Sequence, residues 1–287
     1  METIDSLNKL LEQRTWNPQF SIIDSVRQDN SGNYPVVITG LFLIAFRFPI
    51  DENLAFGCKN CDFKDMTISF YAPEEKVNLD SVKLLIAFHP DLFAWTSCKR
   101  KESDYTFFHY TEKESLHISK RESMVLSAQI ENMRQEMMHC IDYYSYRLLT
   151  SQLETLLDYC LRYYERQFIM RETEGHKIVN EINRFLDTYI LRPSSKTKGL
   201  PSVSRIAAEL GVSPAYLNDL MKVNTGKKTS CYIKFRLVDM AKQRLSGHGE
   251  NITGIAGALG FSDVATFNRV FKEVSGVTPE EYCTVTN

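Results

Sequence analysis

The residue types best suited to metal or redox chemistry in this chain are its seven cysteines and six histidines. Only Cys58 and Cys61 form a CxxC pair, which is at most half of a structural zinc site because such sites use four ligands. The nearest histidine, His89, is far along the chain. This spacing favours two ordinary thiols near a turn, with metal or redox use as the alternative.

Three histidines, His89, His109 and His117, occur in or just after a region of strand-like patterning. They lack the H-x-H spacing with a following Glu that is usual for a metal site in a small β domain. The neighbouring residues instead predict a polar turn at His89–Asp91 and an aromatic packing segment at Phe107–Tyr110. We therefore predict no metal, no other cofactor and no catalytic residues, and we do not expect an enzyme.

Length and charge set broader limits. A chain of 287 residues predicts about two domains. Residues 196–287 carry 12 Lys and Arg against 8 Asp and Glu, whereas residues 1–195 carry 22 against 28. The C-terminal part is therefore the one expected to meet a polyanion. The polar, acidic start, the dispersed cysteines and the lack of an apolar run near ~20 residues predict a cytoplasmic protein with no membrane partner.

An internal repeat near the C-terminus is the most informative feature. The segments Ile206–Ser213 and Ile255–Ser262 share Ile, Ala, Leu, Gly and Ser in the same order. After one inserted residue the match continues. The further pairs are Leu217 and Phe267, Leu220 and Val270, Met221 and Phe271, Lys222 and Lys272, Gly226 and Gly276, and Tyr232 and Tyr282. The chain therefore repeats one structural unit.

Each copy has the pattern of a helix, a tight turn and a second helix. In the first copy Ser202 caps a short helix, Gly211 makes the turn, and Ser213 with Pro214 starts the next helix. In the second copy the predicted cap is Ser262. This is the helix-turn-helix pattern, in which the second helix enters the major groove of DNA.

A helical connector over about Ser230–Leu245 joins the two copies and would be about 24 Å long. A rod of that length can hold two reading helices over major-groove segments about 34 Å apart. The alternative is a pair of helical hairpins that only pack a core. The register of the copies and the local positive charge favour DNA binding.

These residues resemble the AraC/XylS family of bacterial transcription regulators over about residues 180–283. The clearest stretches are Ile252–Ser262, Phe267–Lys272 and Gly276–Tyr282, which are similar to the family's I-x-x-I-A-x-x-x-G-F, F-x-R-x-F-K and G-x-T-P-x-x-Y signature. The first copy matches at Ile206, Ser213, Tyr216, Leu217, Lys222, Gly226, Tyr232 and Arg236.

The resemblance implies which residues contact DNA. They are Ala215, Tyr216, Asn218, Asp219 and Lys222 in the first copy, and Val264, Ala265, Thr266, Asn268, Arg269 and Lys272 in the second. Asn suits adenine, Arg suits guanine or phosphate, and Thr or Ala can touch a thymine methyl group. The two lysines suit phosphates, which position a protein without specifying sequence.

Three features depart from the family pattern. Asp219 stands where many members carry a basic residue, although a carboxylate can accept a hydrogen bond from cytosine N4. Gly254 and Gly257 weaken the first helix of the second copy by about 1 kcal/mol each, so we expect that copy to bind more weakly or to order on DNA. Cys283 replaces the arginine usual after the final tyrosine.

The N-terminal region has strand-like patterning from Tyr34 to His89. Strands are expected in Val36–Phe48, Met66–Tyr71 and Val82–Phe88, in a small antiparallel sheet or barrel. The family resemblance implies a cupin-like sensor or dimerisation domain. A nearby group of aromatic residues could line an effector pocket or form core: Phe93, Trp95, Phe107, Phe108 and Tyr110.

Helical patterning begins at Ser119. Capping boxes at Ser119–Glu122 and Ser151–Glu154 predict two helices, and the second carries an apolar stripe. That stripe is Leu153, Leu156, Leu157, Cys160, Leu161, Tyr164 and Phe168. It fits either an intramolecular hairpin or, as the family favours, a dimer interface. A charged, glycine-containing linker is expected at Arg171–His176.

Together these observations predict an α+β chain. A cupin-like β domain (residues 1–118) and a helical hairpin (119–170) precede an all-α domain (171–287) with two helix-turn-helix motifs joined by a linker helix. The expected function is transcription regulation on double-stranded promoter DNA. A small-molecule effector, a homodimer and, for an activator, RNA polymerase are the further partners expected. The alternative is a cupin-like sugar-binding or enzymatic domain with an accessory DNA-binding module.

Overall fold

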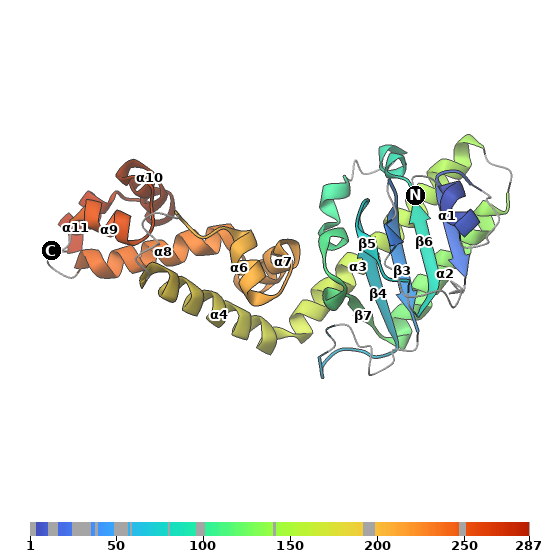
Figure 1. Cartoon of the computed structure of the whole chain (residues 1–287), viewed down its shortest axis with the longest axis horizontal. Coiled ribbons are helices and arrows are strands. Elements are labelled where there is room, and N and C mark those ends of the chain that lie inside the picture. Colours follow the sequence, from blue (N-terminus) through green and yellow to red (C-terminus); the bar gives the residue numbers. More distant parts are fainter. Residues whose placement is uncertain are drawn as a thin grey trace. The chain divides into compact units, whose positions relative to one another are not determined.

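Antiparallel pairing of short apolar segments builds a five-stranded sheet in the N-terminal part of the computed structural model (Figure 1). In sheet order the strands are β1 (Phe20–Asp24), β6 (Val82–Phe88), β3 (Phe42–Arg47), β4 (Met66–Tyr71) and β7 (Leu116–Ile118). A second sheet pairs β2 (Val36–Val37) with β5 (Lys76–Val77). The predicted antiparallel sheet is confirmed.

The structure describes residues 4–10, 17–24, 36–37, 40–48, 57, 59–79, 81–95, 101–139, 142–191, 199–246 and 251–286. The chain divides into two units, Met1–Arg171 and Glu172–Asn287, which we call unit 1 and unit 2 and consider separately.

The strand pattern of the sequence was partly misleading. The predicted strands Met66–Tyr71 and Val82–Phe88 match β4 and β6. The predicted strand Val36–Phe48 is divided into β2 and β3, because Gly40 between them has a φ of 75° and interrupts the extended backbone. Short β1, β7 and the helix α1 (Ile4–Leu10) were not predicted.

Different elements cover the two faces of the sheet, since side chains alternate along each strand. On one face, Leu43 and Ala45 of β3 lie in a core cluster with Ile4 and Leu7 of α1. On the other face, Phe42 and Phe70 meet rings from the 3-10 helix η4 (Thr106–His109), at 4.7 Å for Phe42–Phe108 and 4.2 Å for Phe70–Phe107. The other 3-10 helices are η2 (Pro90–Trp95), η3 (Glu102–Asp104) and η5 (Glu112–Glu114).

The aromatic segment predicted as pocket lining or core is core in this structure. Phe107 and Phe108 are fully buried, and Tyr110 is nearly so. Phe93 packs on Phe42 and Phe88 with ring centroids 5.7 and 5.8 Å away. The side chain of Trp95 lies outside the described residues.

The predicted helical hairpin is present as α2 (Lys120–Met137) and α3 (Tyr143–Met170), which pack on each other. The capping box at Ser119 and Glu122 is confirmed, because each side chain accepts a hydrogen bond from the other residue's backbone N–H.

The second capping box, at Ser151–Glu154, is wrong because these residues lie inside α3. Asp142 starts the helix upstream, since its carboxylate accepts hydrogen bonds from the backbone N–H groups of Tyr144 and Ser145 at 2.8 Å. The apolar stripe of α3 is buried within unit 1, apart from the half-buried Leu161. Tyr164, for example, stacks on Phe107 at 5.6 Å.

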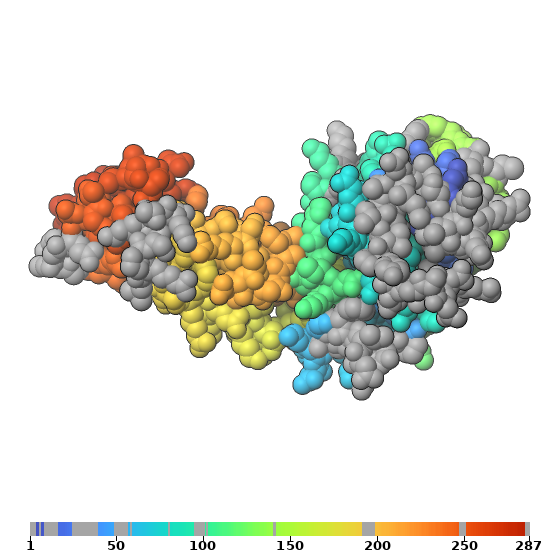
Figure 2. Space-filling view, in the orientation of Figure 1, coloured from blue at the N-terminus to red at the C-terminus, as the bar shows by residue number. Residues whose placement is uncertain are grey.

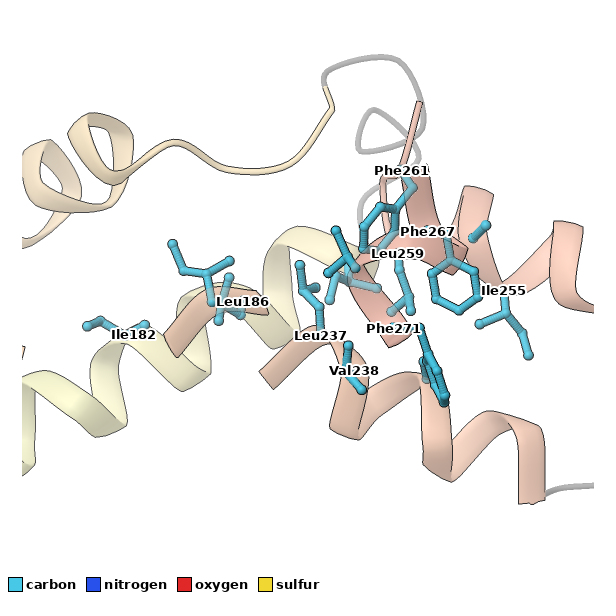
Figure 3. Packing of buried hydrophobic residues seen from close by; sticks show 14 of the residues in the cluster. Ile182, Leu186, Leu237, Val238, Ile255, Leu259, Phe261, Phe267 and Phe271 are labelled. Atoms are coloured by element: carbon cyan, nitrogen blue, oxygen red, sulfur yellow. The ribbon is translucent and has the colours of Figure 1, made fainter. Parts of the chain in front are cut away.

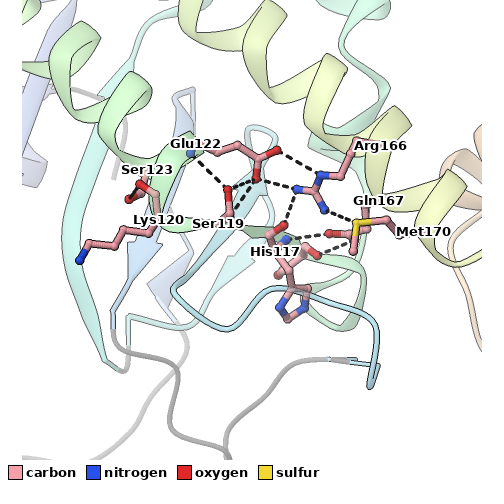
Figure 4. A network of polar contacts seen from close by, with 9 residues as sticks. His117, Ser119, Lys120, Glu122, Ser123, Arg166, Gln167 and Met170 are labelled. Carbon is pink, nitrogen blue, oxygen red and sulfur yellow. Dashed lines mark hydrogen bonds and ion pairs between the residues drawn. The ribbon is translucent and has the colours of Figure 1, made fainter.

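A polar network joins the hairpin to the sheet edge (Figure 4). Gln167, which is fully buried, accepts a hydrogen bond from the backbone N–H of His117 at 2.7 Å and donates one to the carbonyl of Ser115 at 3.2 Å. Arg166 donates to Glu122 and to the carbonyl of His117. A side chain of α3 therefore satisfies backbone groups of edge strand β7 that another strand would otherwise pair.

Unit 2 is entirely helical in its described residues: α4 (Glu172–Leu191), α6 (Val203–Leu210), α7 (Pro214–Thr225), α8 (Thr229–Ser246), α9 (Ile252–Ala258), α10 (Val264–Ser275) and α11 (Pro279–Thr286). The predicted connector is α8. Its residues Leu237 and Val238 lie in one core with Leu186 of α4 and with Phe267 and Phe271 of α10 (Figure 3).

The predicted linker at Arg171–His176 is wrong, because α4 begins at Glu172. Arg171 is buried in unit 1, where its Nε donates to Asp62 at 3.0 Å. Gly175 is also buried, inside α4. The contacts that order this segment come from residues distant in sequence. Its charged residues and its glycine are typical of a linker, which is why the sequence pattern predicted one.

Candidate nucleic-acid interface

The first copy of the repeat folds as a helix-turn-helix. Ser202 caps α6, which ends at Gly211 with a left-handed φ of 67°. The side chain of Ser213 accepts from the backbone N–H of Tyr216 at 3.1 Å and so caps α7, with Pro214 in the first turn. These features are the ones predicted, because short polar caps and glycine at a left-handed position act locally.

The second copy has the same arrangement with a different cap. Asp263, and not the predicted Ser262, accepts from the backbone N–H of Thr266 at 2.6 Å. This hydrogen bond lowers the pKa of Asp263. Ser262 donates to the same carboxylate at 2.8 Å. The turn of the second copy is therefore one residue longer, which is why the register of the repeat changes between the two helices.

Equivalent side chains form an outward stripe on α7 and α10, which we call the reading stripes. Positions four and then three residues apart lie on one face of a helix. The stripes are Ala215, Asp219 and Lys222 on α7, and Ala265, Arg269 and Lys272 on α10. All three α10 residues and Lys222 are exposed, while Ala215 and Asp219 are half-buried. Figure 2 shows the first copy in yellow to orange and the second in red.

Two residues predicted to contact DNA in the first copy also make contacts within the protein. Tyr216 is only 5% exposed and belongs to the core. Asn218 is half-buried, and its Oδ1 accepts from the backbone N–H of Thr229 at 3.2 Å, at the start of α8. Asn218 thus caps the connector helix, a role that the sequence conceals because the two residues lie on different helices.

The equivalent asparagine of the second copy differs. Pro279 occupies the position that matches Thr229 and has no backbone N–H to donate. The amide of Asn268 donates weakly to Glu280 at 3.4 Å, and within the described chain its Oδ1 is buried without a partner. Val264 and Thr266 are half-buried, and the hydroxyl of Thr266 donates to Asp263.

Sequence reasoning missed two lysines directly after α7. Lys228 is exposed, and Lys227 lies over the ring of Phe235 at 4.7 Å. The pair follows Gly226 in the sequence, which was the available signal. Val277 and Thr278 occupy these positions in the second copy, so the added positive charge belongs to the first copy alone.

Two basic residues of α8 pair with acidic side chains of unit 2. Lys234 pairs with Glu273 at 3.0 Å, and Arg236 lies 3.4 Å from Asp187. Among the described residues of the two copies, the exposed cations include Lys222, Lys228, Arg269 and Lys272.

The two helix-weakening glycines of the second copy have different surroundings. A Cβ on Gly254 would lie 2.9 Å from Oδ1 of Asn251, the residue that caps α9 through the Gly254 N–H. A Cβ on Gly257 would meet no atom within 4 Å. Cys283 is half-buried against the core of unit 2.

The residues first considered for metal chemistry do not come together in the described residues. Cys58 lies outside them, and Cys61 is exposed. His117 is buried on β7, His109 is exposed, and half-buried His89 accepts from the N–H of Asp91 at 3.2 Å. No group of three metal-binding side chains occurs in the described ranges. Nor does any helix there have the length and apolarity to cross a membrane.

Comparison with known proteins agrees with the geometry. Residues 206–284 match the family described as "Helix-turn-helix domain". The chain is 30% identical over 108 residues to the probable transcription factor PqrA of Proteus vulgaris, which covers 38% of this chain and 84% of PqrA. It is 38% identical over 74 residues to the raffinose operon regulatory protein RafR of Pediococcus pentosaceus, covering 25% and 26% of the two chains.

A solved transcriptional regulator of Chromobacterium violaceum, described as AraC-type, is 29% identical, with 30% of this chain and 77% of that chain covered at a TM-score of 0.29. The match spans about a third or less of the length of several curated relatives. It spans 84% of the length of PqrA at 30% identity. The chain therefore belongs to the AraC/XylS family of transcriptional regulators.

Proposed function

We propose that this protein is a sequence-specific DNA-binding transcriptional regulator that reads two adjacent major-groove segments with α7 and α10. The observation that carries the proposal is the pair of reading stripes, which repeat the same positions on two helices that each begin with a side-chain cap. The curated relatives described above are named as regulators, which supports a regulatory role over an enzymatic one.

The side chains of the stripes suggest different tasks. Arg269 suits guanine or a phosphate, and Asp219 suits the amino group of cytosine. Lys222 and Lys272 suit phosphates, which would set the position of each helix. With 18 residues, α8 is about 27 Å long and can hold two helices over neighbouring turns of the groove.

Selection from a random duplex library with the full chain tests this proposal. We expect enrichment of duplexes with two half-elements about one helical turn apart, bound with a steep salt dependence because phosphate contacts release counterions. Enrichment of one short element would show that only one copy reads DNA. No enrichment by folded protein would contradict the proposal.

We also propose that unit 1 senses a small effector. A cavity of about 240 Å³ lies between the sheet and α2. Its walls are about equally apolar and polar, and the charged groups are Lys83, Glu131 and the Arg134–Asp24 ion pair. The apolar members of its lining are Phe46, Phe48, Met66, Leu84, Leu126 and Ile130. This composition suits a small molecule with an apolar body and a polar end.

A thermal-shift screen of small amphipathic molecules tests the sensing role, because a ligand that binds the folded state raises the melting temperature. Ser127→Trp, which places bulk in the cavity lining, should abolish the shift. Ala128→Trp, on the next residue of α2 and outside that lining, is the matched control. A shift that survives Ser127→Trp would remove this cavity as the site.

For self-association we propose the surface around the turn of the α2–α3 hairpin, in place of the buried stripe of α3. Met138, Tyr143, Tyr144 and Leu148 are 47–78% exposed there. Tyr144→Lys should lower the molar mass measured by light scattering after size exclusion, while Met124→Lys, at an equally exposed site near the other end of α2, should not. An unchanged mass in both variants would contradict this surface. For an activator, RNA polymerase would be a further partner.

A further inference from the structure

The contact between α4 and the first reading helix is unusually close. Gly175 is buried in the first turn of α4, and a Cβ built on it would lie 2.3 Å from Oδ1 and 2.6 Å from Cγ and Nδ2 of Asn224. Asn224 belongs to the last turn of α7. Real Cβ atoms do not approach other atoms so closely, so any residue larger than glycine requires the Asn224 side chain or one of the two helices to shift.

Asn224 is not free to swing away without loss. Its Nδ2 donates to the carbonyl of Leu220 at 2.8 Å, which holds the side chain along α7. Leu220 is itself buried in the core. A larger residue at position 175 must therefore either break this hydrogen bond or displace the last turn of α7.

Glycine inside a helix is disfavoured relative to alanine, so its presence in α4 calls for a packing reason. Gly257 in α9 provides the contrast, because a Cβ there would meet no atom within 4 Å. Both glycines lie inside helices, and they differ in whether another side chain occupies the space next to the Cα atom.

We propose that Gly175 is a positioning residue for DNA reading, which sets the place of the Lys222 end of α7 through its contact with Asn224. The proposal rests on the function proposed above. Lys222 lies two residues from Asn224 and is the exposed basic residue of the first reading stripe. Arg171, anchored in unit 1 by Asp62, precedes Gly175 by one helical turn. The contact therefore lies in the first turn of the helix that follows unit 1 in the sequence.

The test is a double-mutant cycle in the full chain: wild type, Gly175→Ala, Asn224→Ala and the double variant, with Gly257→Ala as the control for adding a methyl group to a helical glycine. Binding is measured on the selected duplex and on duplexes with either half-element scrambled. The half-element whose base preference changes in Arg269→Ala belongs to α10, and the other is assigned to α7.

We expect Gly175→Ala to weaken binding to the selected duplex about five- to tenfold, the size of one impaired contact. The loss should disappear on the duplex whose α7 element is scrambled, and Asn224→Ala should restore binding to within about twofold. Gly257→Ala should leave the α7 element unaffected.

Binding by Gly175→Ala within about twofold of wild type would overturn the proposal. So would an equal loss on every duplex, which would indicate a general structural defect, or no restoration by Asn224→Ala. If Gly175→Ala does not fold, Asn224→Gln adds bulk to the same contact from α7 and should reproduce the selective loss. If the wild-type chain selects no duplex, the proposed function and this proposal are both overturned. If it selects two half-elements, the proposed function stands and the double-mutant cycle tests the role of Gly175 separately.

Discussion

Replacing Gly257 by alanine should stabilise unit 2. Gly257 lies inside α9, and a Cβ there would meet no atom within 4 Å. The substitution therefore adds no clash. It removes the excess backbone freedom of glycine from the unfolded chain and supplies the better helix former.

The expected gain is about 0.5–1 kcal/mol, because alanine is favoured over glycine in a helix interior by about that amount. For a domain of this size such a gain corresponds to a rise in melting temperature of roughly 2–4 °C. Since α9 is the first helix of the second copy, we also expect the α10 half-element to be bound at least as tightly as in the wild type.

Gly276→Ala is the matched control. A Cβ at Gly276 would also meet no atom within 4 Å, but its φ of 82° is a left-handed conformation. Alanine there costs about 1–2 kcal/mol, so the same chemical change should have opposite signs at the two positions. Urea unfolding of the full chain followed by circular dichroism measures both. Destabilisation by Gly257→Ala, or shifts of the same sign at both positions, would refute the helical assignment of α9 at Gly257.

Three further outcomes are expected. Asn218→Ala should lower the free energy of unfolding by about 0.5–2 kcal/mol in urea titrations, because it removes the acceptor for the Thr229 N–H. Asn218→Asp keeps that acceptor and is the control. The base preference of the protein should stay unchanged in both variants. Lys222→Ala should reduce the slope of log K against log salt by about 0.9 if Lys222 neutralises one phosphate; an unchanged slope would remove that contact. The backbone hydrogen bond from Ser145 lowers the pKa of Asp142, so the stabilisation from this cap is present at neutral pH and is lost as pH falls through the lowered pKa. Acid unfolding of Asp142→Ala should accordingly start from a lower stability at neutral pH and converge with the wild type in acid; parallel curves would contradict the cap.

Features set by neighbouring residues were predictable from the sequence. The caps at Ser202 and Ser213, the glycine turns and the connector helix depend on interactions within a few residues. The buried positions of α7 and α10 follow from helical periodicity, and the core residues Leu217 and Phe267 lie where the repeat placed them.

The sequence did not show which of two candidate capping residues starts a helix. Two capping candidates stand side by side at Ser262 and Asp263, and the carboxylate is the one that accepts the Thr266 N–H. Asp142 likewise starts α3 ahead of the capping box at Ser151. Sequence spacing identifies both candidates in each case but does not decide between them.

Features set by distant residues were hidden altogether. Arg171 is buried because Asp62 lies beside it in unit 1. Gly175 lies against Asn224, whose side chain fills the space that a Cβ would need. The hydrogen bond that Asn218 accepts was hidden for the same reason, since its partner Thr229 lies on another helix. These interactions depend on tertiary packing, which helical periodicity does not encode.

The measurement that tests the central claim most directly is a cross between protein and DNA variants on the selected site. Wild type, Arg269→Ala and Asp219→Ala are titrated against duplexes that carry each base substitution in each half-element. Two copies that both read DNA predict that Arg269→Ala loses about 1–3 kcal/mol of discrimination in one half-element only, and that Asp219→Ala changes base preference in the other. Changes by both variants in the same half-element, or in neither, would contradict the claim that α7 and α10 each read a segment of the groove.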